Sequence, residues 1–310
     1  MNGESYALFL LSMAKWSTSV ALLWLIGVIG YRVLVGHGIA ESREPGGTDR
    51  RLVVHAGLAT GLLVLASAAR LYAQTYSAFG LDEPVTGALL RLVAEQTRWG
   101  ARWQIQVGAA VVAMVTTVLV WLRWRGAWFL LGAVGLVVVG SAPLTGHAWA
   151  YAGGRLWPWS LQLVHLLAAG VWLGSLFVLL VDGLQAMSRE RRDRKARVVR
   201  LVDRFSPAAL TAAAIVGGTG ALTALLYVDE WSQLWQTLYG RVLLVKMGLF
   251  GLIMMLGAYN WKFVKPRLAD ADGVERLRYS GGAELAVAVV LLAVTAWLVH
   301  LPMPQDGMAH

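Results

Sequence analysis

Residues 146–180, GHAWAYAGGRLWPWSLQLVHLLAAGVWLGSLFVLL, contain the feature that decides the fold. From Trp159 onward this stretch is apolar for long enough to cross a bilayer, which takes about 20 helical residues. One histidine, His147, stands in the aromatic segment before the apolar helix, and a second, His165, stands inside it. A polar ring in hydrocarbon is costly unless it faces the bundle interior or a ligand, so His165 indicates a functional site.

The same apolar pattern recurs along the chain, which is 57% hydrophobic and only 15% charged. A soluble domain carries about 25% charged residues, so this composition indicates a membrane protein. Eight segments are long enough to span a bilayer. They are residues 7–34, 52–78, 103–122, 127–144, 159–184, 206–228, 238–263 and 280–301. The sequence therefore predicts an all-α membrane protein, a polytopic bundle of eight transmembrane helices that forms a single integral membrane domain over residues 1–310.

The basic residues predict the orientation of this bundle. The formal net charge is +9, but the Lys and Arg residues stand in short connections between spans, so a nucleic-acid partner is not expected. If the amino terminus is outside, the inner connections hold eighteen basic residues and the outer ones four. Residues 186–204 are then a basic cytoplasmic loop, and residues 81–102, with a helical pattern near 86–94, a periplasmic surface segment. Both termini then lie outside, which in the inner membrane of a bacterium is the periplasmic face, and the first segment is expected to remain as a span.

Costly polar residues fall mainly in the expected outer half of the bundle. The absence of cysteine excludes thiolate sites, so a metal would need His, Met or carboxylate ligands. His147, His165, His300 and Met303 are the candidate ligands. Imidazole suits copper, zinc and haem iron, and the thioether sulfur of Met suits Cu⁺. The tail also offers Met308 and His310.

Other polar residues are candidates for electrostatic or structural roles. Lys15 and Lys246 each stand more than two turns inside a span, where they would neutralise an anionic ligand or exclude cations. Arg70 is close enough to a span end to reach water. Trp172 is predicted on the face of His165, and Gly170 and Gly174 would let another helix approach closely. His55 is expected to be structural. Glu284 is either interfacial or part of an ion path.

Several motifs with their order and spacing resemble the bacterial copper resistance protein D family (the CopD-like membrane domain). The resemblance covers roughly residues 140–300. The matching pieces are Gly146-His147-Ala148, VHLLAAGVWLG at 164–174, Arg204-Phe205-Ser206, Gly218-Thr219-Gly220, TLYGRVLLVK at 237–246 and Ala258-Tyr259-Asn260.

This resemblance implies a polytopic inner-membrane protein linked to copper resistance or to copper import from the periplasm. It also implies a small periplasmic copper-binding partner of the CopC type and a shared role for Lys246. A transporter or metal-binding protein, rather than an enzyme, is the leading hypothesis. The main alternative is a membrane haem protein or oxidoreductase with His147 and His165 as axial ligands of haem b. A third is an assembly factor for a copper oxidase.

Overall fold

The computed structural model describes residues 3–36, 47–145, 156–183, 191–228, 230–270 and 272–301, and these residues form helices without a strand. The first half contains α1 (Gly3–Gly36), α2 (Gly47–Phe79), α3 (Gly87–Gln96), α4 (Arg98–Trp121) and α5 (Ala127–Ser141), followed by the short 3-10 helix η1 (Ala142–Thr145). The fifth span consists of α7 (Leu156–Ala169), η2 (Gly170–Gly174), α8 (Ser175–Val178) and η3 (Leu179–Gly183). It is followed by α9 (Arg191–Tyr227), α10 (Gln233–Gln236), α11 (Leu238–Tyr259), η4 (Asn260–Val264), η5 (Lys265–Arg267) and α12 (Gly273–Leu298).

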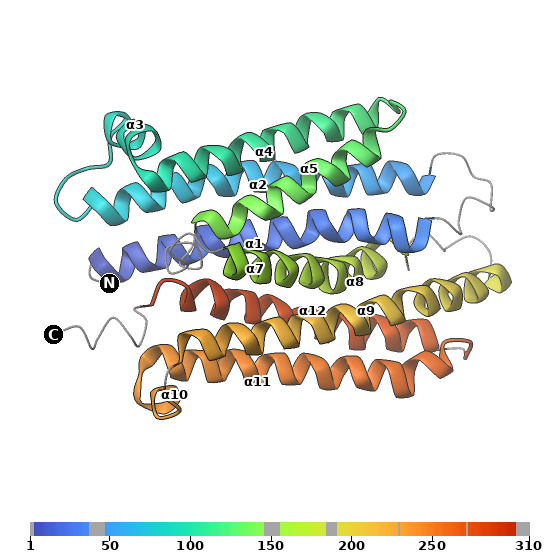
Figure 1. Cartoon of the computed structure of the whole chain (residues 1–310). Coiled ribbons are helices and arrows are strands. Elements are labelled where there is room, and N and C mark those ends of the chain that lie inside the picture. Colours follow the sequence, from blue (N-terminus) through green and yellow to red (C-terminus); the bar gives the residue numbers. More distant parts are fainter. Residues whose placement is uncertain are drawn as a thin grey trace.

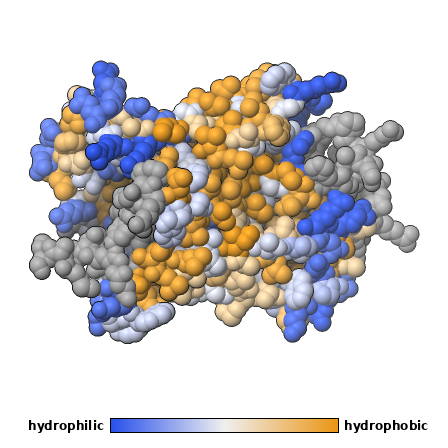
Figure 2. All heavy atoms as spheres, in the orientation of Figure 1, coloured by the Kyte–Doolittle hydropathy of each residue, from blue (hydrophilic) through white to orange (hydrophobic). Residues whose placement is uncertain are grey.

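Eight of these helical segments are long and apolar enough to cross a membrane, which confirms the predicted eight-span bundle. Figure 1 shows them side by side, with the start of α1 and the end of α12 at the same end of the bundle. Large apolar side chains on the outside, such as Leu65 and Phe129, are mostly exposed. In Figure 2 the apolar residues form a band between two hydrophilic ends. This surface is the one expected of a multi-pass protein embedded in a lipid bilayer.

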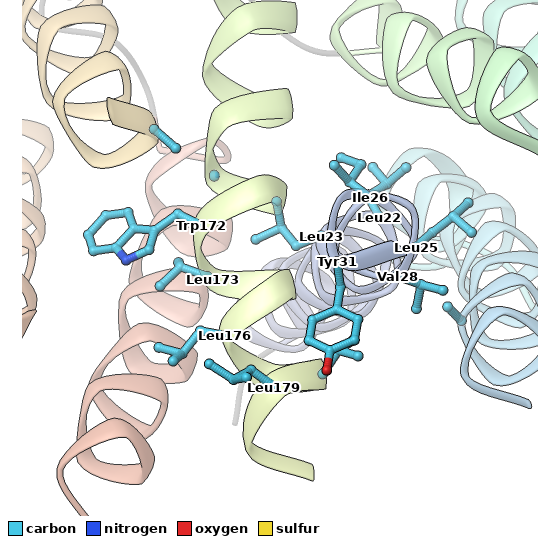
Figure 3. Packing of buried hydrophobic residues seen from close by; sticks show 14 of the residues in the cluster. Leu22, Leu23, Leu25, Ile26, Val28, Tyr31, Trp172, Leu173, Leu176 and Leu179 are labelled. Atoms are coloured by element: carbon cyan, nitrogen blue, oxygen red, sulfur yellow. The ribbon is translucent and has the colours of Figure 1, made fainter. Parts of the chain in front are cut away.

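The core lies around α1, which packs against α2, α5, α9, α12 and the fifth span. Leu25 and Val28 are completely buried there. Figure 3 shows Leu23 between α1 and the fifth span, and Trp172 on the side of the fifth span that faces away from α1. A Cβ atom at Gly174 would overlap the backbone of Leu23. The close helix approach predicted from Gly170 and Gly174 is therefore confirmed, and α1 is the helix that approaches.

Two helices begin earlier than the sequence predicts. Helix α9 starts at Arg191, so most of the predicted basic loop at 186–204 is helical. The reason is an apolar stripe of Val198, Leu201, Val202 and Phe205 at helical spacing, all of which are buried. Helix α12 starts at Gly273 rather than near 280, and Leu277 in its second turn is also buried.

The two halves of the chain share one order of elements. Each half has two long helices, a short helix, a third long helix capped by a threonine, and a fourth long helix. The third helices begin alike: Thr97 Oγ1 accepts from the N–H of Gly100 at 2.8 Å, and Thr237 Oγ1 accepts from the N–H of Gly240 at 2.9 Å. Both glycines pack directly on the backbone of the preceding short helix. The chain thus consists of two four-helix units with the same order of elements and the same capping pattern, which no motif in the sequence indicated.

The segment 81–102 contains the predicted helix. Thr86 caps α3, its Oγ1 accepting from the N–H of Leu89 at 3.4 Å, and Val93 is the residue that α3 buries. The connection between α4 and α5 is the short turn expected from its sequence, with Arg123 and Gly126 in left-handed conformations at φ 59° and 82°. The segment 81–102 lies between α2 and α4, and the turn joins α4 to α5, so each connection keeps the two spans on either side of it antiparallel.

Candidate functional site

His165 is held by hydrogen bonds to Thr219 and to the backbone of Val216 in the neighbouring helix. Its Nδ1 lies 2.8 Å from Oγ1 of Thr219 in α9. The Thr219 hydroxyl hydrogen is used in a 2.6 Å bond to the carbonyl oxygen of Ile215, so its oxygen accepts from His165. This network assigns the ring proton to Nδ1 and leaves the lone pair on Nε2. Metal-binding histidines are typically held in this way, with the other ring nitrogen donating to a protein oxygen.

The surroundings of His165 fit a ligand that arrives from the side of the bundle. The imidazole lies against α9 at Gly220, where a Cβ would be in van der Waals contact with His165 Cε1 at 3.6 Å. An open apolar groove of about 370 Å³ runs between α7 and α9 and ends at Thr219. It is lined by Trp157, Ser160, Leu161, Val164, Thr219, Leu222, Leu225 and Leu226. The groove therefore leads to the residue that positions His165.

Lys246 of α11 lies close enough to His165 to interact with it electrostatically. It comes from the motif at 237–246, and Thr237 at the start of this helix fixes its position along the axis. A positive charge here opposes the binding of another cation. Any metal bound by His165 must therefore gain enough from its ligands to offset this repulsion.

A second polar group occupies the corresponding place in the first half. Arg70 of α2 donates from Nη1 to Gln106 Oε1 at 2.6 Å and from Nη2 to Thr145 Oγ1 at 3.0 Å. Its charge also reaches Lys15 of α1. Gln106 and Lys246 stand at the same distance along the chain from their capping threonines. The structure thus separates the predicted electrostatic residues into two equivalent groups, Lys15 with Arg70 and His165 with Lys246.

The two halves differ in how closely their helices pack around these polar groups. In the first half α2 packs directly on α4, which brings Arg70 to Gln106. In the second half α9 makes few contacts with α11, and Phe250 is the side chain that reaches Gly217 between them. The second half is therefore the more open one, and it contains His165.

Trp172 does not share the environment of His165. The π-helix η2 widens the turn after residue 169, so the seven-residue spacing no longer returns to the same face. Trp172 Nε1 instead donates to Glu284 Oε1 at 3.1 Å, and Asn260 Nδ2 donates to Glu284 Oε2 at 3.1 Å. Glu284 is only 4% exposed and lies three turns inside α12, near its middle. Glu284 is therefore a buried acceptor that joins η2, η4 and α12.

The substitution Glu284→Ala is expected to lower the free energy of unfolding by roughly 3 kcal/mol, because it leaves two buried N–H donors without an acceptor. Thermal unfolding of the detergent-purified protein measures this loss. Glu275→Ala, at an exposed position of the same helix, is the matched control and should change the melting temperature little. Equal melting temperatures for both variants would contradict the role of Glu284 as the acceptor that joins the three elements.

His55 lies at the opposite end of the bundle from His165, and both of its ring nitrogens are occupied. Nδ1 accepts from Trp24 Nε1 at 3.1 Å, and Nε2 lies 3.1 Å from Asp182 Oδ2. Arg51 stands 3.9 Å from the same carboxylate. This geometry leaves no lone pair for a metal, which agrees with the structural role expected of His55.

We expect His55→Ala to leave copper binding unchanged while it lowers the melting temperature, because it removes a buried partner of Trp24 and Asp182. Copper content after dialysis and a thermal melt of the same sample test both parts. A loss of copper in this variant would place a metal site at the other end of the bundle.

The remaining predicted ligands are not brought together by the described residues. His147, Met303, Met308 and His310 lie outside them. His300 follows α12, where its backbone N–H donates to the Trp297 carbonyl oxygen at 3.0 Å. Within the described ranges no three His, Asp or Glu side chains converge as a metal site. Thr219, Gln106 and Asn260, in contrast, were not predicted as site residues, although the sequence shows Thr219 between two glycines inside a span.

The fold and the polar groups define a multi-pass helical membrane protein with buried charged residues and a histidine inside one of its spans. Two family models match it: the copper resistance protein D-like N-terminal domain over residues 5–157, and copper resistance protein D over residues 199–298. The first match covers the half in which the sequence motifs showed no resemblance. The chain belongs to the CopD-like family of copper resistance membrane proteins.

Two curated proteins are similar to this chain. It is 28% identical over 306 residues to "Copper resistance protein D" of Pseudomonas syringae pv. tomato, covering 94% of this chain and 96% of that protein. It is 29% identical over 218 residues to "Copper transport protein CutJ" of Bacillus subtilis (strain 168), covering 68% of this chain. That match spans only 38% of the length of the Bacillus protein. No solved structure matches the chain.

Proposed function

We propose that this protein takes copper from the periplasmic face of the bacterial inner membrane and binds it at His165 in the outer half of the second four-helix unit. The observation that carries this proposal is the orientation of His165. Thr219 accepts from Nδ1, so Nε2 keeps the lone pair that a copper ion needs. The groove between α7 and α9 provides a route to Thr219 from the end of the bundle where α7 begins.

A single imidazole does not complete a copper site. His147 precedes α7 in the sequence, and His300 and Met303 follow α12 at the same end, so they are the further ligands that we propose. Nitrogen and thioether ligands together favour Cu⁺, and ligation by several of them offsets the repulsion from Lys246. A periplasmic copper-binding protein of the CopC type would deliver the ion to this end of the bundle. The positive-inside pattern supports placing this end in the periplasm.

The test is metal analysis and an absorption spectrum on one detergent-purified sample, before and after addition of Cu⁺ under reducing conditions. Stoichiometric copper without a Soret band supports the proposal, and copper uptake into vesicles that contain the protein then measures transport. Copper binding without flux would favour an assembly factor. A stoichiometric Soret band would instead identify a haem protein, with His147 and His165 as the candidate axial ligands.

A further inference from the structure

The first four-helix unit contains buried hydrogen-bond donors that have no matching acceptor. Arg70 is 7% exposed, and its two side-chain hydrogen bonds go to the neutral oxygens of Gln106 and Thr145. A guanidinium group has five N–H donors and accepts nothing. Among the described residues no carboxylate pairs with Arg70. The positive charge is therefore held inside the bundle by neutral groups alone.

Gln106 adds a second unmatched donor next to the guanidinium. Its Oε1 must face Arg70, because arginine offers only donors. Nε2 is bonded to the same carbon as Oε1, so it lies beside the guanidinium, where it is buried without a hydrogen-bond partner. Gln106 is 0% exposed. A fully buried amide N–H₂ at this place calls for an acceptor that the described side chains do not supply.

Ser12 provides a third donor from α1. Ser17, Thr18 and Ser19 of this helix donate to the carbonyl four residues earlier, whereas the buried Ser12 Oγ has no partner. The ring contacts between Tyr6 and Tyr76 and between Trp24 and His55 fix the antiparallel register of α1 and α2. Interpolation between them puts Ser12 level with Arg70. Lys15, one turn further along, brings a second positive charge within reach of Arg70.

We propose that a small monovalent inorganic anion, such as chloride, binds between Ser12, Lys15, Arg70 and Gln106. An anion accepts from every one of these donors and reverses the repulsion between the two cations. A water molecule fits less well, because it is neutral and would leave the two positive charges uncompensated. The proposal does not depend on copper binding, since all four residues belong to the first unit.

The proposed anion site has a counterpart in the second four-helix unit. Gln106 and Lys246 stand equally far from the threonines that cap α4 and α11. The proposed anion site of the first unit therefore includes the position that Lys246, which interacts electrostatically with His165, has in the second unit. An anion held there adds negative charge to an outer half that contains the buried Arg70 and the half-buried Lys15 and Lys246.

The experiment measures thermal unfolding of the full chain in detergent while chloride replaces gluconate at constant ionic strength. Chloride should raise the melting temperature saturably, by about 5 °C when binding is saturated. Gln106→Glu should abolish this dependence, because the new carboxylate occupies the site and pairs with Arg70 directly. Gln104→Glu is the matched control: it is the same change two residues away on the exposed face of α4, and the chloride response should persist.

The outcomes separate the possibilities. A wild-type protein that melts identically in chloride and gluconate overturns the proposal, and so does a chloride response that survives in Gln106→Glu. If Gln106→Glu does not fold, Ser12→Ala provides the second test. It should raise the chloride concentration for half-maximal stabilisation about tenfold, through loss of one hydrogen bond to a charged ligand. An unchanged midpoint in Ser12→Ala would exclude the serine from the site and contradict the assignment.

Discussion

His165→Ala is expected to reduce bound Cu⁺ from a stoichiometric amount to background while the protein remains folded. The imidazole stands inside a span and presents the Nε2 lone pair, because Thr219 accepts from its Nδ1. Alanine removes that ligand, and a hydrocarbon interior has no water to replace it. The measurement is copper per chain after dialysis, together with a thermal melt that shows the variant is folded.

Thr219→Val provides a graded control for this experiment. Valine keeps the shape of threonine but cannot accept from His165, so the imidazole remains and loses its orientation. Loss of such a partner typically lowers metal affinity about 10- to 100-fold. Full loss in His165→Ala and partial loss in Thr219→Val is the expected order. Unaltered copper binding in His165→Ala would remove this residue from the site and with it the proposed entry through the second unit.

The eight-span fold was largely predictable because the apolar segments are long. The bounds that were missed have local causes. Val198, Leu201 and Phe205 extend α9 into a segment whose charges suggested a loop, and they do so by burying one face only. The duplication was not predictable either. It is carried by the order of elements and by a threonine cap with a closely packed glycine, not by long matching sequences.

The site was predictable one residue at a time but not as a group. Depth alone singled out His165, Lys246, Lys15 and Arg70, because ionisable or polar groups are rare in hydrocarbon. Which of these residues contact one another depends on how the helices pack, and the spacing of residues along single helices does not determine that. Trp172 shows the limit most directly: an α-helical spacing put it with His165, and a π-helix turned it to Glu284. Gln106 and Asn260 carry no charge, so their position inside a span did not identify them as candidate site residues.

Gly174→Ala is expected to destabilise the protein by roughly 3 kcal/mol or more and to prevent its accumulation in the membrane. A methyl group at this position would overlap the Leu23 backbone of α1 and approach Gly27, and backbone atoms cannot rotate away as a flexible side chain can. The fifth span would have to separate from α1, around which the core is built. Membrane abundance and thermal unfolding in detergent measure the effect.

Gly251→Ala is the matched control, because it adds the same methyl group inside a span where no atom lies within 4 Å. Alanine is also the better helix former, so this variant should be as stable as the wild type or slightly more stable. The comparison separates steric contact from any general intolerance of substitution in a membrane helix. A Gly174→Ala protein as stable as Gly251→Ala would show that α1 and the fifth span are further apart than described. In that case the position of His165, which the fifth span carries, would have to be revised with them.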